Sequence, residues 1–230
     1  LRTGAVYGTG KREENLRGYF AAISAMDEQI GRLLDAVEEQ GLADNTVILF
    51  TADNGMSMGQ HGVWGKGNGT FPMNMYDSAV KVPFLISWPG HIPANTVCSE
   101  MISACDLLPT ILKLTGLSDK QPTGLPGRSF TELLEGRQLE HRDEVVIFDE
   151  YGPVRMIRTK EWKYVHRYPY GKHELYHLVD DPGEEKNLYG LPEYKKLVTQ
   201  LKGRMEKWFC TYSDPAIDGV RSAVNGSGQL

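Results

Sequence analysis

Two oxygen-bearing side chains directly follow a short apolar run. Residues 46–51 are apolar and rich in β-branched side chains, which predicts a strand buried on both faces, as in a parallel sheet. Asp53 and Asn54 come next, and in open α/β sheets binding sites form where the strands end. A carboxylate and an amide oxygen are ligands of the kind that Ca²⁺ or Mg²⁺ requires, although two donors leave a coordination shell incomplete. An ordinary Asp-Asn-Gly turn is the alternative interpretation.

A lysine between two glycines lies in the loop that follows. The ammonium of Lys66 is a compact point charge that suits a tetrahedral sulfate or phosphate. His61, in the same loop, could donate a hydrogen bond or move a proton near neutral pH. A solvated lysine and a surface histidine are the alternatives, so the loop alone leaves anion binding open.

The elements that must position these side chains are those of an α/β domain. Apolar residues at steps of three and four predict an amphipathic helix from Asn15 to Gln40, and Gly41 suits the position after a helix. Glycines interrupt every periodicity over residues 52–80, which predicts a long loop of the kind that is usually functional or disordered. Residues 82–87 return to a strand, with Pro83 at its start or on an edge.

The second half of the chain predicts shorter elements. Residues 106–115 read as a helix with Asp106 as the N-cap, and a linker rich in Pro and Gly covers residues 121–127. A further short helix is expected at 129–134, an antiparallel meander of strands at 145–149, 154–158, 162–166 and 174–178, and a closing helix at 192–209. We therefore expect an α/β domain at 1–127, a small α+β subdomain at 128–212 and a loosely held tail at 213–230.

Composition narrows the class of protein. The net charge of −5 and the isoelectric point near 5.7 argue against nucleic-acid binding, which normally needs a basic surplus. No apolar run approaches the ~20 residues that a membrane-spanning helix requires. The three cysteines form no C-x-x-C pair, which gives no support to a zinc or thioredoxin-like site. The start at Leu1 resembles that of a fragment, and the compartment stays open, with periplasmic, secreted and lysosomal-type locations all compatible.

A series of motifs connects the chain to a known family. The segment from Asn45 to Gly55 closely resembles the metal-binding segment of the sulfatase family, within the alkaline-phosphatase-like superfamily. Further matches follow in the family's order: His61-Gly62, Trp64, Lys66, Tyr76-Asp77, Lys81-Val82-Pro83, Trp88-Pro89-Gly90, Asp106-Leu107-Leu108-Pro109-Thr110, Glu174-Leu175-Tyr176 and the D-P-x-E-x-x-N-L pattern at 181–188. The resemblance runs from about Tyr19 to Trp208, and the shared order makes it more specific than any single motif.

The resemblance implies part of an active site. Asp53 and Asn54 would be two ligands of the active-site cation, Ca²⁺ by preference and Mg²⁺ as the alternative, and Lys66 would contact the sulfate group. The resemblance gives weaker support to a substrate-binding role for His61, because that position varies in the family. The implied fold is part of an alkaline-phosphatase-like mixed sheet flanked by helices, followed by a small α+β subdomain with an antiparallel sheet and a C-terminal helix. Asp77 and Lys81 depart from the family, where Glu and Arg are commoner.

The nucleophile of such an enzyme has no counterpart here. Sulfatases that resemble this chain use a formylglycine made in a C/S-x-P-x-R motif, which this sequence lacks. We therefore expect the C-terminal fragment of a sulfatase, inactive alone, whose partners are a sulfate ester and the N-terminal part of the same enzyme. A phosphodiester or phosphonate hydrolase of the same superfamily is one alternative, and a non-catalytic binding module is another.

A group of basic and aromatic residues near the end of the meander suits a sulfated sugar or, equally, a solvated rim. Its members are His166, Arg167, Tyr168, Tyr170, Lys172 and His173.

Overall fold

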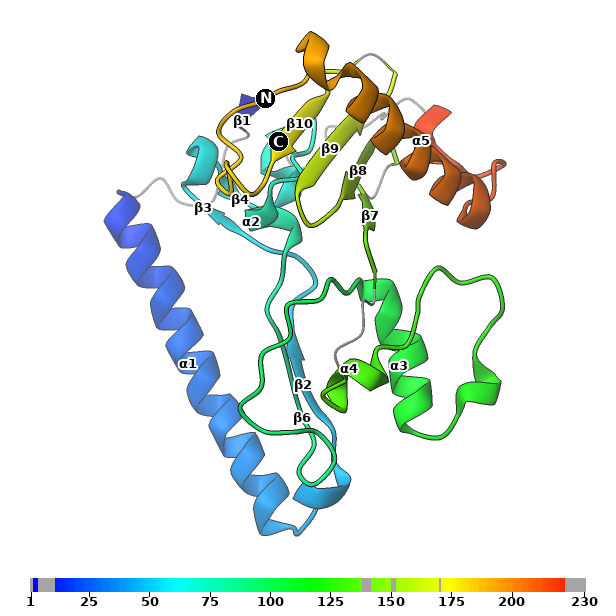
Figure 1. Cartoon of the computed structure of the whole chain (residues 1–230). Helices are drawn as coiled ribbons and strands as arrows, with labels where there is room; N and C mark the ends of the chain where they lie inside the picture. Colours follow the sequence, from blue (N-terminus) through cyan, green and yellow to red (C-terminus); the bar gives the residue numbers. More distant parts are fainter. Residues whose placement is uncertain (1, 4–10, 138–141, 150–151, 170, 222–230) are drawn as a thin grey trace. The chain divides into compact units, whose positions relative to one another are not determined.

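The computed structural model describes residues 2–3, 11–137, 142–149, 152–169 and 171–221 (Figure 1). It divides into two compact units, one that reaches to Thr96 and one that begins at Val97. The predicted domain boundary near residue 127 and the tail boundary at 213 stay predictions. Within the described part of the chain, no helix combines the length and the apolar character needed to cross a membrane.

The first unit contains one long helix, α1 (Arg12–Glu39). The predicted helix is confirmed, and Gly41 beyond its end has a φ of +66°, which a residue without a side chain adopts at little cost. None of the residues of α1 is buried. Phe20, Met26 and Leu33 are 59%, 45% and 67% exposed, so the apolar stripe of the helix lies largely open to solvent.

Strand β2 (Ile48–Thr51) differs in part from the prediction. It pairs with β6 (Phe84–Ser87) in antiparallel register, with Thr51 opposite Phe84. All four residues of β2 are only half-buried, so a strand covered on both faces within a parallel sheet is wrong for the described chain. The apolar run was read correctly as a strand, but its partner and its degree of burial depend on other segments. Pro83 directly precedes β6, as predicted.

The long loop between these strands holds only short elements. Strands β3 (Ser57–Met58) and β4 (Trp64–Gly65) pair with each other, and β5 (Thr70–Phe71) pairs with β1 (Arg2–Thr3). Helix α2 (Asp77–Val80) closes the loop, and 3₁₀ turns lie at Ala43–Asn45, Gln60–Gly62 and Gly67–Gly69.

The second unit is built around the predicted antiparallel meander, which is confirmed. Its strands are β7 (Val145–Phe148), β8 (Val154–Arg158), β9 (Trp162–Arg167) and β10 (Glu174–His177), in the order β10-β9-β8-β7. Helix α5 (Lys195–Tyr212) packs on β8 and β9 (Figure 1), after a 3₁₀ turn at Pro192–Tyr194.

The core of this unit lies between the meander and α5. Val146, Ile157, Tyr164 and Leu175 stand opposite one another in the register of the four strands, and they form one row across the sheet. Leu201, Met205 and Phe209 of α5 cover that row, and every member of the cluster is less than a tenth exposed. Leu201, Met205 and Phe209 are four positions apart, about one helical turn, so they lie on one face of α5 and that face packs on the sheet.

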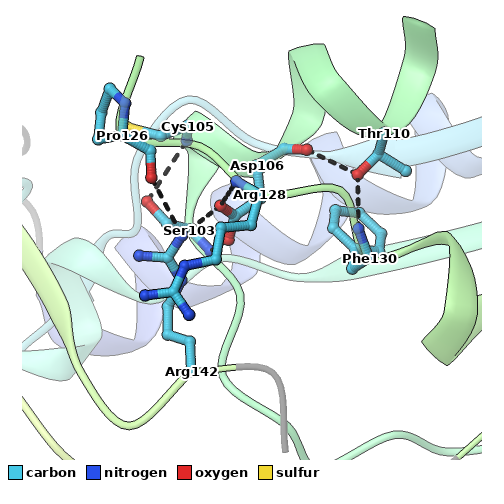
Figure 2. A network of polar contacts seen from close by, with 8 residues as sticks. All are labelled: Ser103, Cys105, Asp106, Thr110, Pro126, Arg128, Phe130 and Arg142. Atoms are coloured by element: carbon cyan, nitrogen blue, oxygen red, sulfur yellow. Dashed lines mark hydrogen bonds and ion pairs between the residues drawn. The ribbon is translucent and has the colours of Figure 1, made fainter. Parts of the chain in front are cut away.

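A buried carboxylate organises the segment before the meander (Figure 2). Asp106 is fully buried, accepts hydrogen bonds from the backbone N–H groups of Ser103 and Arg128 (both 2.8 Å), and forms an ion pair with Arg142. Asp106 stands at the predicted N-cap position of α3 (Leu107–Leu114), but its carboxylate does not cap that helix. It turns back into a capping box with Ser103 around the 3₁₀ turn Ala104–Asp106. A capping interaction therefore exists, but Ser103 is the cap residue.

Thr110, in α3, extends this network to the next helix. Its hydroxyl donates to the Asp106 carbonyl (2.6 Å) and accepts from the N–H of Phe130, just before α4 (Thr131–Leu134). A 3₁₀ turn at Ser118–Lys120 lies between the two helices. The D-x-x-P-T motif is thus a structural motif here, since its Asp and Thr satisfy buried backbone groups.

The D-P-x-E-x-x-N-L motif also has a structural role. The Asp181 carboxylate accepts from the N–H groups of Glu185 and Lys186, and Glu184 forms a buried ion pair with Lys163 of β9 at 2.5 Å. The Asn187 side chain accepts from the N–H of Leu175 in β10 and donates to the carbonyl of His173. These contacts fasten the segment to the sheet.

The last described residues are also attached to the sheet. Asp218 forms an ion pair with the buried Arg155 of β8, and a 3₁₀ turn follows at Gly219–Arg221. The rest of the predicted tail, 222–230, lies outside the described residues.

The buried pair of Asp106 and Arg142 gives a stability prediction. The substitution Asp106→Asn removes the partner of a guanidinium that is 7% exposed, and it should lower the free energy of unfolding by about 3–5 kcal/mol. Chemical denaturation followed by circular dichroism measures the change. Asp143→Asn is the matched control, because Asp143 is 73% exposed in its ion pair with Arg204 and should cost less than about 1 kcal/mol. Equal losses in the two variants would contradict the prediction.

Candidate functional site

The candidate site begins where β2 ends. The hydroxyl of Thr51 donates to the carbonyl of Pro83 (2.9 Å), which ties the end of β2 to the start of β6. Asp53 and Asn54 lie in the bend that follows, Asp53 exposed and Asn54 half-buried. The backbone N–H of Asn54 donates to Oδ1 of Asp53 (2.8 Å), which holds the Asp53 carboxylate against the bend.

Lys66 meets this pair from the glycine-rich loop. Its Nζ donates to Oδ1 of Asn54 at 3.3 Å, although the two residues lie twelve positions apart. An amide oxygen has two lone pairs, so Oδ1 of Asn54 retains an acceptor position beside this contact. The structure therefore brings together two of the residues that the sequence singled out, while their roles in binding stay predictions.

His61 has a different neighbour. Its ring stacks on that of Tyr76, with centroids 3.7 Å apart and planes 5° from parallel. The backbone at His61 has a φ of +53°, between Gly59 and Gly62, which are also in the left-handed region. The described contact is thus a packing contact, and the predicted role of His61 in substrate binding stays a prediction.

The short segment that contains α2 supports the bend at Asp53. The N–H of Gly55 donates to the carbonyl of Ala79 (2.9 Å), and the hydroxyls of Ser57 and Ser78 lie 2.7 Å apart. A Cβ atom at position 55 would lie 2.2 Å from the carbonyl oxygen of Ser78, so only glycine permits this approach. Sequence reasoning passed over these contacts, because a glycine and two serines in a loop carry no periodic signal.

The donors present fit part of a hard-cation site. Asp53 and Asn54 supply oxygen, as Ca²⁺ and Mg²⁺ prefer. Among the described residues, no three His, Cys, Asp or Glu side chains gather closely enough to hold a metal ion. The binding of a cation by Asp53 and Asn54 stays a prediction.

Within the basic and aromatic group at the end of the meander, His166 and Arg167 lie in the interior, Tyr168 and His173 are half-buried, and Lys172 is exposed. His166 and Arg167 are 6% and 2% exposed, and Arg167 forms an ion pair with Glu174 at 3.0 Å. The hydroxyl of Tyr164 and Nδ1 of His166 are 2.6 Å apart, and the ring of His166 stacks on that of His173 with centroids 4.0 Å apart. These side chains pack the second unit; Tyr170 lies outside the described residues.

Burial also changes the protonation of these histidines. It is the main reason that the pKa of His166 falls from its ordinary value of 6.5 to about 3, and the nearby His173, Lys202 and Arg155 lower it further. The pKa of His173 is lowered as well, chiefly by burial and then by Lys202 and Arg167. Burial raises the pKa of Tyr168 to about 12. The pair of histidines is therefore neutral in the folded protein near pH 7.

Comparisons with known proteins point to one family. Residues 59–210 match the family model described as N-sulphoglucosamine sulphohydrolase, C-terminal. The chain is 31% identical over 219 residues to an N-acetylglucosamine-6-O-sulfatase of Bacteroides thetaiotaomicron, and this match covers 89% of the chain and 37% of the relative. The chain thus spans well under half the length of that curated relative.

Solved structures agree with the sequence relatives. A protein solved with its substrate D-glucosamine-2-N,6-O-disulfate superposes with a TM-score of 0.79 and 30% identity, over 94% of this chain and 45% of the other. A phosphonate monoester hydrolase of Agrobacterium radiobacter superposes with a TM-score of 0.72 and 27% identity, over 84% and 41%. The predicted fold class, part of an alkaline-phosphatase-like domain followed by a small antiparallel sheet and a C-terminal helix, is confirmed.

The neutral histidines predict acid sensitivity. Because the folded-state pKa of His166 lies below its unfolded value, the unfolded chain binds a proton first, and stability should fall as the pH drops from about 6.5 towards 3. His166→Gln should flatten this decline, as thermal unfolding at several pH values would measure. His177→Gln, at a histidine with a 25% exposed side chain in the same unit, should keep the wild-type decline. A decline unchanged in His166→Gln would contradict the assignment.

The close approach at Gly55 predicts a position intolerant of alanine. Gly55→Ala places a methyl group 2.2 Å from a backbone oxygen, so the bend that carries Asp53 must shift, at a cost of about 1–3 kcal/mol in unfolding free energy. The control is Gly31→Ala in α1, where nothing lies within 4 Å and alanine should stabilise the helix by up to about 1 kcal/mol. Denaturant titration of both variants measures the difference, and a neutral Gly55→Ala would show that the approach is not required.

Proposed function

The chain belongs to the sulfatase family, in the region described as N-sulphoglucosamine sulphohydrolase, C-terminal, and on this premise we propose that it supplies one part of a sulfatase active site. Asp53 and Asn54 hold the active-site cation, Ca²⁺ by preference, and Lys66 binds the sulfate group. The observation that carries the proposal is the 3.3 Å contact between Nζ of Lys66 and Oδ1 of Asn54, since it puts a cationic donor beside a cation ligand.

The chemistry assigned to this chain is electrostatic. The ammonium of Lys66 neutralises charge on the nonbridging oxygens of the sulfate while the S–O bond breaks. A cation held by Asp53 and Asn54 would supply a second positive charge at the site. Asp53 and Asn54 would hold that cation, and the hydrogen bond from the backbone N–H of Asn54 limits the movement of the Asp53 carboxylate.

The nucleophile comes from elsewhere in this proposal. No C/S-x-P-x-R motif occurs in the 230 residues, so the formylglycine belongs to an N-terminal part of the same enzyme. The chain alone is then inactive. The exposed apolar stripe of α1, with Phe20, Met26 and Leu33, and the half-buried β2 are surfaces that such a part would cover.

The proposed substrate is a sulfated carbohydrate. One relative carries the name N-acetylglucosamine-6-O-sulfatase, and one structural neighbour was solved with a disulfated glucosamine. Each of these two proteins is linked to a sulfated amino sugar, and this is the reason for proposing an amino-sugar sulfate as the substrate here.

A second function has a specific observation in its favour. The superposition with a phosphonate monoester hydrolase supports hydrolysis of a phosphonate or phosphodiester, since oxygen ligands and a lysine serve a phosphoryl group equally well. Comparison of kcat/KM for an aryl sulfate and for a phosphonate monoester decides between the two, and higher turnover of the phosphonate would replace the sulfatase assignment.

The test of the proposed function uses the complete enzyme that contains this chain. With a chromogenic aryl sulfate and calcium, Lys66→Ala should lower kcat/KM by about 10²–10³-fold. Asp53→Ala should abolish this calcium-dependent turnover, because the cation loses a ligand. Lys120→Ala, at a side chain 69% exposed, is the control and should leave turnover unchanged. The 230-residue chain by itself should show no turnover, and turnover that survives Asp53→Ala would refute the assignment of that residue.

A further inference from the structure

Asn74 is a buried polar residue that holds the loop of Lys66. Its side-chain Nδ2 donates to the carbonyl of Gly67 (3.1 Å), to the carbonyl of Lys66 itself (3.3 Å) and to Oγ1 of Thr70 (3.3 Å). Its backbone N–H donates to the carbonyl of Gly67 as well (3.0 Å). The residue is 1% exposed, so these contacts are made away from water, where a hydrogen bond is strong and its loss is costly.

The contacts define the path of the backbone at Lys66. The Lys66 carbonyl also accepts from the N–H of Gly69 (2.9 Å), and the hydroxyl of Thr70 donates to the carbonyl of Pro72 (2.9 Å). One amide group thus closes the chain from Lys66 to Asn74 into a single turn. Since a lysine side chain has four rotatable bonds, the position of its ammonium depends first on the direction of its backbone.

The amide contributes donors rather than an acceptor. Two of the three neighbours of Nδ2 are carbonyl oxygens, which can only accept. Oδ1 of Asn74 is buried and has no hydrogen-bond partner among the described residues. An unsatisfied buried oxygen costs free energy, so the stabilising contribution of this amide to the loop comes from its donors.

The same segment also supports the other half of the candidate site. Three residues after Asn74 the chain enters α2, whose Ala79 carbonyl accepts from the N–H of Gly55, next to Asn54. The stretch from Asn74 to Ala79 is therefore attached at one end to the backbone of Lys66 and at the other to the bend of Asp53 and Asn54. Movement at Asn74 would change the distance between Nζ of Lys66 and Oδ1 of Asn54.

We infer that Asn74 is a positioning residue for Lys66, and that its side-chain amide sets where the ammonium meets the sulfate group. This inference rests on the proposed function of Lys66. Asn74 itself need not touch substrate, because its three contacts are all to the loop. Removal of the amide should release the loop, and displacements of about 1 Å at a binding group can cost about 10²-fold in rate.

A double-mutant cycle in the complete enzyme tests this. Asn74→Ala should lower kcat/KM for an aryl sulfate by about 10–10²-fold and raise the inhibition constant of inorganic sulfate. In the background of Lys66→Ala, the same substitution should have little further effect, less than about threefold, because its target is already absent. Multiplicative losses in the double variant would overturn the inference and leave Asn74 a purely structural residue.

Two more variants separate positioning from general destabilisation. Asn74→Asp keeps the shape of the side chain but presents acceptors to two carbonyl oxygens, so it should be at least as impaired as Asn74→Ala. Thr110→Val removes an equally buried hydroxyl from the second unit, and it should lower the melting temperature without changing the sulfate inhibition constant. An Asn74→Ala variant that behaves like Thr110→Val would overturn the inference. If Lys66→Ala itself leaves activity and sulfate inhibition unchanged, the proposed function of Lys66 fails instead.

Discussion

The candidate site depends on how closely two backbone segments approach each other at Gly55. The N–H of that glycine reaches the carbonyl of Ala79, and the space beside it is filled by the carbonyl of Ser78. Any side chain would separate the two segments, since a Cβ there would overlap a backbone oxygen that cannot move without its helix. Asp53 and Asn54 are carried on one side of this approach, and the loop that presents Lys66 is anchored on the other. A backbone contact, with no charge of its own, thus sets the distance between the charged and polar groups of the site.

The second unit relies on a different principle, which is the pairing of charges within its interior. Asp106 with Arg142 and Glu184 with Lys163 are ion pairs with almost no exposure. Such pairs contribute specificity more than net stability, because desolvation offsets much of the attraction, while loss of one partner leaves an uncompensated charge. Two sequence motifs shared with the sulfatase family supply the acidic members. Their presence in this chain is accounted for by packing, and neither motif requires contact with a substrate.

Much of the fold could be predicted from the sequence. The long first helix, the four strands of the meander and the closing helix agree with the structure, because each follows from an alternation or a helical period within a few residues. The covering of residues 46–51 was predicted wrongly. A run of apolar side chains is compatible with burial on both faces of a strand. Whether both faces of β2 are covered depends on segments elsewhere, which the sequence of β2 does not specify. The capping role of Asp106 was wrong for a related reason, since its partners Arg128 and Arg142 lie far along the chain.

The candidate site, like the fold, has a part that the sequence predicts and a part that depends on tertiary contacts. The sequence by itself determined that oxygen donors follow a strand and that a lysine lies among glycines, since both are properties of neighbouring residues. The resemblance to the sulfatase family added the expectation that Asp53, Asn54 and Lys66 belong to one site. Only the tertiary structure decided that Lys66 lies against Asn54, that His61 packs on Tyr76, and that Asn74 holds the loop. These contacts join residues across turns of the backbone, and the geometry of such turns depends on hydrogen bonds between distant groups, which local preferences do not specify.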